Sequence, residues 1–277
     1  MPGTLYIVAT PIGNLEDITL RAIRVLQQVD LITAEDTRHS LRLLQSLEIH
    51  KPLISLHEHN EQKRVEEIYA LLQEGKDIAL ISDAGTPCIS DPGARLIQQL
   101  RQKQDSRICP VPGPSALITA LSATGLTQGG FVFYGFLPVK GKERKAILSA
   151  IASRTQTAVL YESPHKLIKT LQDLQSYCQN PVITLARELT KVYEEFISDT
   201  AENLILRYTD TPPKGEFVLL ISPGQTEQEP DLPLAQALMQ QYLSQGIKHK
   251  QAAEQVASQT GLTKKQAYEL GLQYLKK

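Results

Sequence analysis

The residues best suited to chemistry stand together at positions 35–39, where the chain reads Glu-Asp-Thr-Arg-His. They directly follow a short apolar run at positions 31–34. Acids and a base grouped at the end of a strand can orient a hydroxyl group and accept its proton. In the alternative interpretation, Asp36 or Thr37 caps the following helix and Arg38 is its ion-pair partner. The residues alone leave both interpretations open.

Three short apolar runs in the first half of the chain each end in a loop rich in glycine and proline. Such runs lack polar alternation and predict strands buried on both faces, and ligands bind beyond the carboxyl ends of strands in open α/β sheets. Glycine lets the backbone approach a ligand, and proline stiffens the loop. One such loop would indicate only a tight turn, but three indicate a ligand crevice. The runs and their loops are residues 5–9 with 10–14, 78–81 with 82–87, and 108–111 with 112–116.

The loops do not have the pattern of a phosphate-binding site. No GxxxxGK[ST] follows any of the strands, and the first loop lacks GxGxxG. A crevice lined by backbone and small residues suits an adenosine-containing ligand whose charge is not on phosphates, such as S-adenosylmethionine. His57 and His59 would point to opposite faces of a continuing strand, which is poor geometry for chelation, so no metal is expected.

Basic residues gather in two places that could contact nucleic-acid phosphates. Residues 140–145 hold four cations in six positions, namely Lys140, Lys142, Arg144 and Lys145. Lys264 and Lys265 begin a predicted helix near the C-terminus. In both places a solvated charged face is the simpler alternative.

The elements that must position these residues form two blocks and a tail. Residues 1–116 alternate strand and helix patterns, which predicts an α/β domain with a parallel sheet. Residues 117–223 carry more strands than helices, which predicts a second α/β domain with a mixed sheet. Residues 224–233 predict a linker, and residues 234–277 a helical tail that contacts RNA. Further strands are expected at 31–34, 53–56, 131–135, 158–161, 182–186, 192–198 and 217–221, and helices at 20–26, 41–47, 65–72, 234–243, 250–259 and 264–275, the last capped by Thr263.

Composition limits the class of protein. A chain of 277 residues with 42% hydrophobic residues can form two α/β domains. Its net charge of -1 excludes a protein that is basic throughout. Cys88, Cys109 and Cys178 are odd in number and widely spaced, so neither a disulfide framework nor a zinc cluster is expected. Because no signal-like or membrane-spanning stretch is found, we expect a soluble, cytoplasmic protein with no membrane partner.

Seven motifs together resemble the ribosomal RNA small subunit methyltransferase I family, a branch of the tetrapyrrole methylase superfamily. The resemblance covers nearly the whole chain, and the combination of the second and third motifs is highly specific. The motifs are TPIGNLEDITLRA (10–22), AEDTR (34–38), SDAGTPCISDPG (82–93), VPGPSA (111–116), GFLP (135–138), YESPHK (161–166) and RELTKVYEE (187–195).

The resemblance implies two α/β domains of the tetrapyrrole methylase type, with S-adenosyl-L-methionine in the cleft between them, and a homodimer. It also implies methylation of the 2′-hydroxyl of a cytidine in small-subunit (16S) ribosomal RNA, either free or in the assembled small subunit. By position it places cofactor contacts at Pro11, Ala84, Gly85, Thr86, Ile89, Ser115, Ala116, Glu162, Leu189 and Thr190.

For this reaction the proton of a poorly nucleophilic alcohol must be accepted. Asp36 is the first choice for that role and Glu35 the next, with Arg38 holding a backbone phosphate. Two rival functions remain. A tetrapyrrole C-methyltransferase would have no use for the basic residues, and a non-catalytic RNA-binding ribosome-assembly factor need not bind S-adenosylmethionine.

Overall fold

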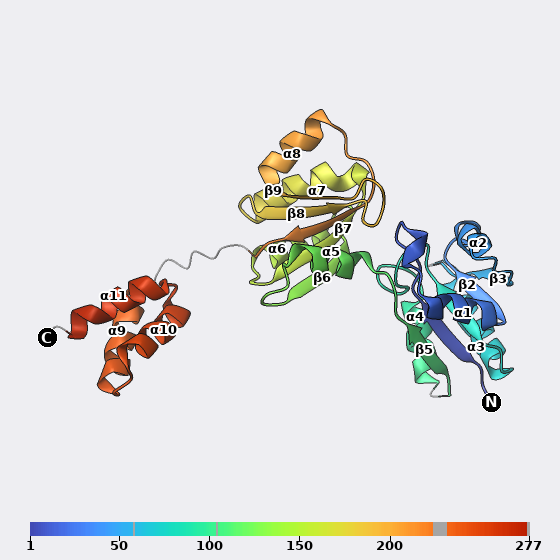
Figure 1. Ribbon diagram of the computed structural model, residues 1–277, viewed down its shortest axis with the longest axis horizontal. Helices are drawn as coiled ribbons and strands as arrows, with labels where there is room; N and C mark the ends of the chain where they lie inside the picture. Colours follow the sequence, from blue (N-terminus) through green and yellow to red (C-terminus); the bar gives the residue numbers. More distant parts are fainter. Residues whose placement is uncertain (58, 104, 224–231, 276–277) are drawn as a thin grey trace. The chain divides into compact units, whose positions relative to one another are not determined.

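The computed structural model describes residues 1–57, 59–103, 105–223 and 232–275. The chain divides into two compact units, Met1–Gly224 and Gln225–Lys277, and each is described by itself (Figure 1). The first unit contains two five-stranded sheets. Most of the predicted linker, residues 224–231, lies outside the described residues.

The first sheet is parallel throughout and has the strand order β3-β2-β4-β1-β5. Because parallel strands end at the same edge, the loops that follow β1, β4 and β5 emerge beside one another. Each strand lies within two residues of its predicted run. The strands are β1 (Thr4–Val8), β2 (Leu31–Ala34), β3 (Leu53–Ser55), β4 (Ile78–Ile81) and β5 (Arg107–Val111).

Helices cover both faces of this sheet, which explains why its strands are apolar without alternation. In β4, Ala79 and Ile81 join the core cluster of α1 and α2, whereas Ile78 and Leu80 join the cluster of α3 and α4. The sequence predicts α1, α2 and α3 but not α4, and α2 and α3 begin four residues earlier than predicted. The helices are α1 (Leu20–Gln28), α2 (Thr37–Ser46), α3 (Glu61–Gln73) and α4 (Ala94–Gln102).

The second sheet is mixed, as predicted, with the order β6-β7-β10-β8-β9. β6 pairs with β7 in parallel, and the other pairs are antiparallel. β9 begins at Glu195, three residues later than predicted, because Val192 and Tyr193 lie in an exposed turn. The strands are β6 (Phe131–Phe136), β7 (Thr157–Glu162), β8 (Val182–Arg187), β9 (Glu195–Thr200) and β10 (Phe217–Ile221).

Three helices cover one face of the second sheet and α5 (Ala116–Thr124) covers the other. Figure 1 shows α7 and α8 lying together over β8 and β9. Ile12, from the loop after β1, belongs to the apolar cluster of α5. A 3-10 turn, η1 (Leu15–Asp17), follows that loop. The three helices on the first face are α6 (Lys142–Ala152), α7 (Pro164–Tyr177) and α8 (Ala201–Asp210).

The second unit contains α9 (Leu232–Ser244), α10 (His249–Thr260) and α11 (Lys264–Leu275) around their own apolar core. Thr263 caps α11 as predicted. Its hydroxyl accepts the Gln266 amide at 3.2 Å, and the Gln266 side chain accepts the Thr263 amide at 2.9 Å, which is a reciprocal capping box. Within the described residues, every helix is too short or too polar to cross a membrane.

Candidate functional site

The three glycine- and proline-rich loops are joined to one another at the carboxyl edge of the first sheet. The amide of Thr10 donates to the carbonyl of Gly85 at 2.8 Å, and the Gly85 amide donates back to Thr10 at 3.0 Å. The Thr86 hydroxyl donates to the Pro114 carbonyl at 3.0 Å. The convergence predicted from three separate runs is therefore confirmed, and the loops support one another as a rigid wall.

Positive φ values occur in the segment after β4 and in the segment after β8. Gly85 has a φ of 80°, in the left-handed region that favours glycine. Ser90 and Thr190 adopt φ values of 66° although they carry side chains. Such conformations cost free energy and persist where the surroundings impose them, often at ligand sites.

A cavity of about 520 Å³, called the main cavity here, lies between the loops and the second sheet. Most residues that the family resemblance places around the cofactor line it. Pro11 instead lines a smaller second cavity. Thr190 does not line the main cavity, and its buried hydroxyl finds no hydrogen-bond partner among the described residues. The predicted cofactor residues that line the main cavity are Ala84, Gly85, Thr86, Ile89, Ser115, Ala116, Glu162 and Leu189.

The main cavity is acidic. Among the described residues that line it, five carry a carboxyl group and none is lysine, arginine or histidine. Burial raises the pKa of Asp91 to about 6; a hydrogen bond from Ser82 opposes this rise and nearby Asp83 adds to it. Burial also raises the pKa of Tyr161, whose hydroxyl accepts the Leu117 amide at 3.1 Å. The five carboxyl groups belong to Glu35, Asp83, Asp91, Glu162 and Glu216.

The sequence analysis did not predict Asp83 and Asp91 as site residues. Both belong to the segment at 82–93, in which the glycine and proline residues predicted a ligand-binding loop. The available signal was the presence of acids in a loop directly after a buried strand.

Asp36 does not line the main cavity, whereas Glu35 does. The Asp36 carboxylate caps α2 by accepting the Arg38 amide at 2.8 Å, and it pairs with the Arg38 guanidinium at 3.1 Å. These hydrogen bonds from Arg38 lower the pKa of Asp36. The helix-capping alternative therefore describes this carboxylate, and a lowered pKa makes it a weaker proton acceptor.

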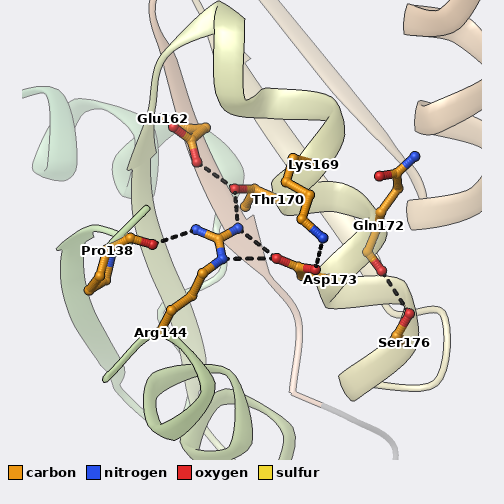
Figure 2. Close-up of polar contacts among 8 residues, drawn as sticks. All are labelled: Pro138, Arg144, Glu162, Lys169, Thr170, Gln172, Asp173 and Ser176. Atoms are coloured by element: carbon orange, nitrogen blue, oxygen red, sulfur yellow. Dashed lines mark hydrogen bonds and ion pairs between the residues drawn. The ribbon is translucent and has the colours of Figure 1, made fainter. Parts of the chain in front are cut away.

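Glu162 lines the main cavity and begins a chain of polar contacts through Thr170 and Arg144 (Figure 2). The residue is 3% exposed, and its carboxylate accepts the Thr170 hydroxyl at 2.6 Å and the Ser163 amide at 2.8 Å. The Thr170 hydroxyl in turn accepts a hydrogen bond from Arg144 at 3.0 Å. Figure 2 shows Arg144 reaching Asp173 as well, which also pairs with Lys169. Three elements thus hold Glu162 in one orientation.

The prediction that Arg144 contacts RNA is wrong. Its side chain is buried, and its guanidinium is engaged by Asp173 at 2.9 Å, Thr170 at 3.0 Å and the Pro138 carbonyl at 2.9 Å. Counting charges along the sequence could not reveal this, because α6 turns one of its three cations inward. Lys140, Lys142 and Lys145 are exposed.

The tail lysines are also exposed. Lys264 forms an ion pair with Glu254 at 3.5 Å. Lys265 forms no ion pair within the described residues. Their proposed contact with RNA stays a prediction.

The histidine pair and the cysteines give no sign of a metal centre or a reactive thiol. His57 and His59 have ring centroids 6.0 Å apart. No group of three or more potential ligands among the described residues is placed to hold a metal ion. The three cysteines are free, and burial raises the pKa of Cys88 to about 11, which disfavours the thiolate.

Comparisons with known proteins agree with this geometry. Residues 4–205 match the family model of tetrapyrrole (corrin/porphyrin) methylases. The chain is 45% identical over 274 residues to ribosomal RNA small subunit methyltransferase I of Synechocystis sp., with 98% of each chain covered. It is 46% identical over 275 residues to the protein of the same name from Escherichia coli O157:H7, with 98% of this chain and 95% of that one covered.

Solved structures share the fold at low sequence identity. Diphthine synthase superposes with a TM-score of 0.63 at 14% identity, covering 80% of this chain and 90% of that one. A cobalt precorrin-4 methyltransferase of cobalamin biosynthesis gives a TM-score of 0.57 at 20% identity, covering 79% and 94%. The predicted fold class is thereby confirmed.

Proposed function

The chain belongs to the tetrapyrrole methylase family and, within it, to the ribosomal RNA small subunit methyltransferase I group, and we propose that it methylates the 2′-hydroxyl of a cytidine in small-subunit ribosomal RNA. It is an S-adenosylmethionine-dependent methyltransferase. The cytidine and the 2′-oxygen are the parts of the proposal that need a test.

The acidity of the main cavity is the observation that carries the proposal. Its five carboxyl groups, without a lysine, arginine or histidine among the described lining residues, suit a ligand with positive charge and repel one that carries phosphates. S-adenosylmethionine has an ammonium and a sulfonium group, and when bound it supplies an electrophilic methyl group. The cavity volume of about 520 Å³ lies in the usual range for ligand pockets of about 300–1,000 Å³.

The residues present fit this cofactor. Gly85 and Thr86 would offer backbone to the ligand from the strained second loop. Ser115 is the N-cap residue of α5 and Ala116 begins the helix, and both line the main cavity. Glu162 is oriented by Thr170 and can accept a hydrogen bond from a bound ligand.

We propose Glu35, in place of Asp36, as the group that accepts the proton of the ribose hydroxyl. Glu35 lines the main cavity and Asp36 does not, and hydrogen bonds from Arg38 lower the pKa of Asp36, which makes it the weaker proton acceptor. Asp36 then acts as a positioning residue that holds Arg38. The Arg38 side chain is 90% exposed and can contact an RNA phosphate.

The oligomeric state and the cellular location of the protein also belong to the proposal. We propose a homodimer that works in the cytoplasm, where its ribosomal substrate is. Val192 and Tyr193, which are 93% and 75% exposed beside the edge strand β9, support a further protein contact. Sedimentation of the wild-type protein and of Val192→Asp tests the dimer, and a monomeric wild-type protein would contradict it.

The decisive experiment for the activity uses labelled cofactor and small subunits that lack the modification. After incubation, the labelled RNA is cleaved with alkali, because a 2′-O-methyl group protects the adjoining phosphodiester bond. We expect the label in an alkali-resistant dinucleotide whose 5′ residue is cytidine. Label on a base, or on a tetrapyrrole offered in competition, would contradict the proposal.

A further inference from the structure

The second cavity lies beside the main cavity and has a volume of about 280 Å³. Its walls come from the first loop and from α2. Asp83 lines both cavities and is therefore a shared wall. The Asp83 carboxylate also accepts the amide of Asp36 at 3.1 Å, which connects this wall to the end of β2.

The second cavity has a cation in its wall, unlike the main cavity. Arg42 and His39 line it from α2, and both side chains are exposed without an ion pair to any described residue; Asp83 is the one acidic residue among its described lining residues. α2 itself contains no acidic residue. An anionic ligand at Arg42 would give its guanidinium a charge-assisted partner.

The second cavity also has apolar lining. Pro11, Leu15 and Leu43 belong to it, and Leu15 is 53% exposed although it is a large hydrophobic side chain. Apolar side chains beside an arginine suit a ligand that has both a base and a phosphate. RNA recognition commonly combines base contacts of this kind with phosphate contacts.

We propose that the second cavity holds the target nucleotide of the RNA strand, with its base against Leu15 and Leu43 and its phosphate at Arg42 and His39. This inference rests on the proposed function, RNA methylation. The acidic main cavity excludes phosphates, so the strand must be held beside it. With its base and phosphate held there, the ribose lies at the Asp83 wall, and its 2′-hydroxyl must extend past this side chain into the main cavity, where Glu35 lies.

The test compares three variants of the full-length protein. Arg42→Ala removes the phosphate contact, and Leu15→Ala removes part of the base surface. Arg101→Ala is the matched control, because Arg101 is an exposed arginine in the last turn of α4, a helix that leads to the amino end of β5. The probe for binding is a fluorescent single-stranded RNA of fixed sequence, titrated at several salt concentrations.

We expect Arg42→Ala to weaken RNA binding about tenfold and to reduce the salt slope by about one unit, because one phosphate contact is lost. Leu15→Ala should weaken binding without changing the slope. Cofactor affinity, measured by calorimetry, should change less than twofold in both. For unmodified small subunits, KM should rise in both while kcat changes less.

Unchanged RNA affinity in Arg42→Ala would overturn the proposal, and so would an equal loss in Arg101→Ala, which would indicate a general charge effect. A failure of the proposed function looks different. In that case the wild-type protein transfers no methyl group to small subunits, while the RNA titrations still decide whether the second cavity binds RNA.

Discussion

The main cavity and the second cavity share one wall but are built in different ways. The main cavity is enclosed by loops that bond to one another and by Glu162, whose orientation is fixed through Thr170 and Arg144. The second cavity presents Arg42 and His39 as exposed side chains of a single helix. A rigid, prebuilt site suits a small ligand, whereas side chains that can reorient suit an RNA strand with its own conformational freedom.

The difference in charge separates the two ligands. Carboxyl groups in the main cavity attract a cationic cofactor and repel RNA phosphates, and the cations of α2 do the reverse.

The largest effect is expected from breaking the rigid wall of the main cavity. Gly85→Val should abolish measurable cofactor binding. Gly85 has a φ of 80°, and a Cβ there would lie 3.3 Å from Ile12 Cγ2, so the loop must shift and lose its pairing with Thr10. Calorimetry measures the affinity.

Gly125→Val is the matched control for Gly85→Val, because Gly125 has a φ of 66° but no atom within 4 Å of a new Cβ. It should lower thermal stability and leave the cofactor affinity intact. Undiminished affinity in Gly85→Val would show that the loop is only a turn.

The next effect concerns the chemical step. Glu35→Gln should lower kcat about 100-fold or more, since general-base catalysis contributes at least that much, with little change in cofactor affinity. Asp36→Asn should cost less, because its amide oxygen can still accept the Arg38 amide at the helix cap. If Asp83→Asn shows the large loss and Glu35→Gln does not, the proton acceptor is the carboxylate on the shared wall.

An intermediate effect is expected when the support of Glu162 is removed. Thr170→Val should weaken cofactor binding about tenfold, because the Glu162 carboxylate and Arg144 each lose one buried hydrogen-bond partner. Thr170→Ser keeps both hydrogen bonds and should restore the affinity. As a control, Thr184→Val removes the buried hydroxyl that contacts Ser198 and should affect stability alone.

A smaller effect is expected from Asp91 and depends on pH. Its pKa of about 6 means that it is mostly ionised at pH 7.5 and mostly protonated at pH 5.5. Cofactor affinity in the wild-type protein should therefore fall a few-fold between these two pH values. Asp91→Asn should flatten this part of the dependence, leaving the contributions of Asp83 and the other carboxyl groups.

The unliganded protein provides a second measurement on Asp91. Burial raises the pKa of this carboxyl above its ordinary value of 3.8, so the folded state binds its proton more tightly than the unfolded state. This group therefore stabilises the fold less as pH rises through about 6. Asp91→Asn should raise the melting temperature relative to the wild type at pH 7.5 but not at pH 4. An equal difference at both pH values would contradict this assignment.

The fold and the place of the site could be predicted from the sequence because both follow from strand patterns. Buried parallel strands have no polar alternation, and their carboxyl ends share an edge, so the loops at 10–14, 82–87 and 112–116 had to meet. The roles of single charged residues could not be obtained in this way. An aspartate before a helix is equally suited to capping and to catalysis, and the sequence alone does not show that the Asp36 carboxylate accepts hydrogen bonds from Arg38.

Burial explains the other differences. Arg144 and its neighbours look alike in the sequence, but the helical turn of α6 directs Arg144 toward Asp173 and Thr170. Asp91 lies beyond the glycines of the second loop, and the chain returns to the main cavity there through positive φ values at Cys88 and Ser90. The local sequence does not indicate that Arg144 points inward, and it does not indicate that the chain returns to the main cavity at Asp91.

The smallest effect on the main cavity, and a clear effect on RNA, is expected from the C-terminal tail. Cutting the chain near Gly224 should leave cofactor affinity almost unchanged, because α9, α10 and α11 pack around their own apolar core in a separate compact unit. Lys264→Glu with Lys265→Glu should weaken RNA binding and reduce the salt slope by about one unit for each lost phosphate contact. Lys76→Glu, an exposed lysine before the amino end of β4, is the control. Normal methylation of small subunits by the shortened protein would show that the tail lysines form a solvated face, and that the RNA is held by the residues around the second cavity alone.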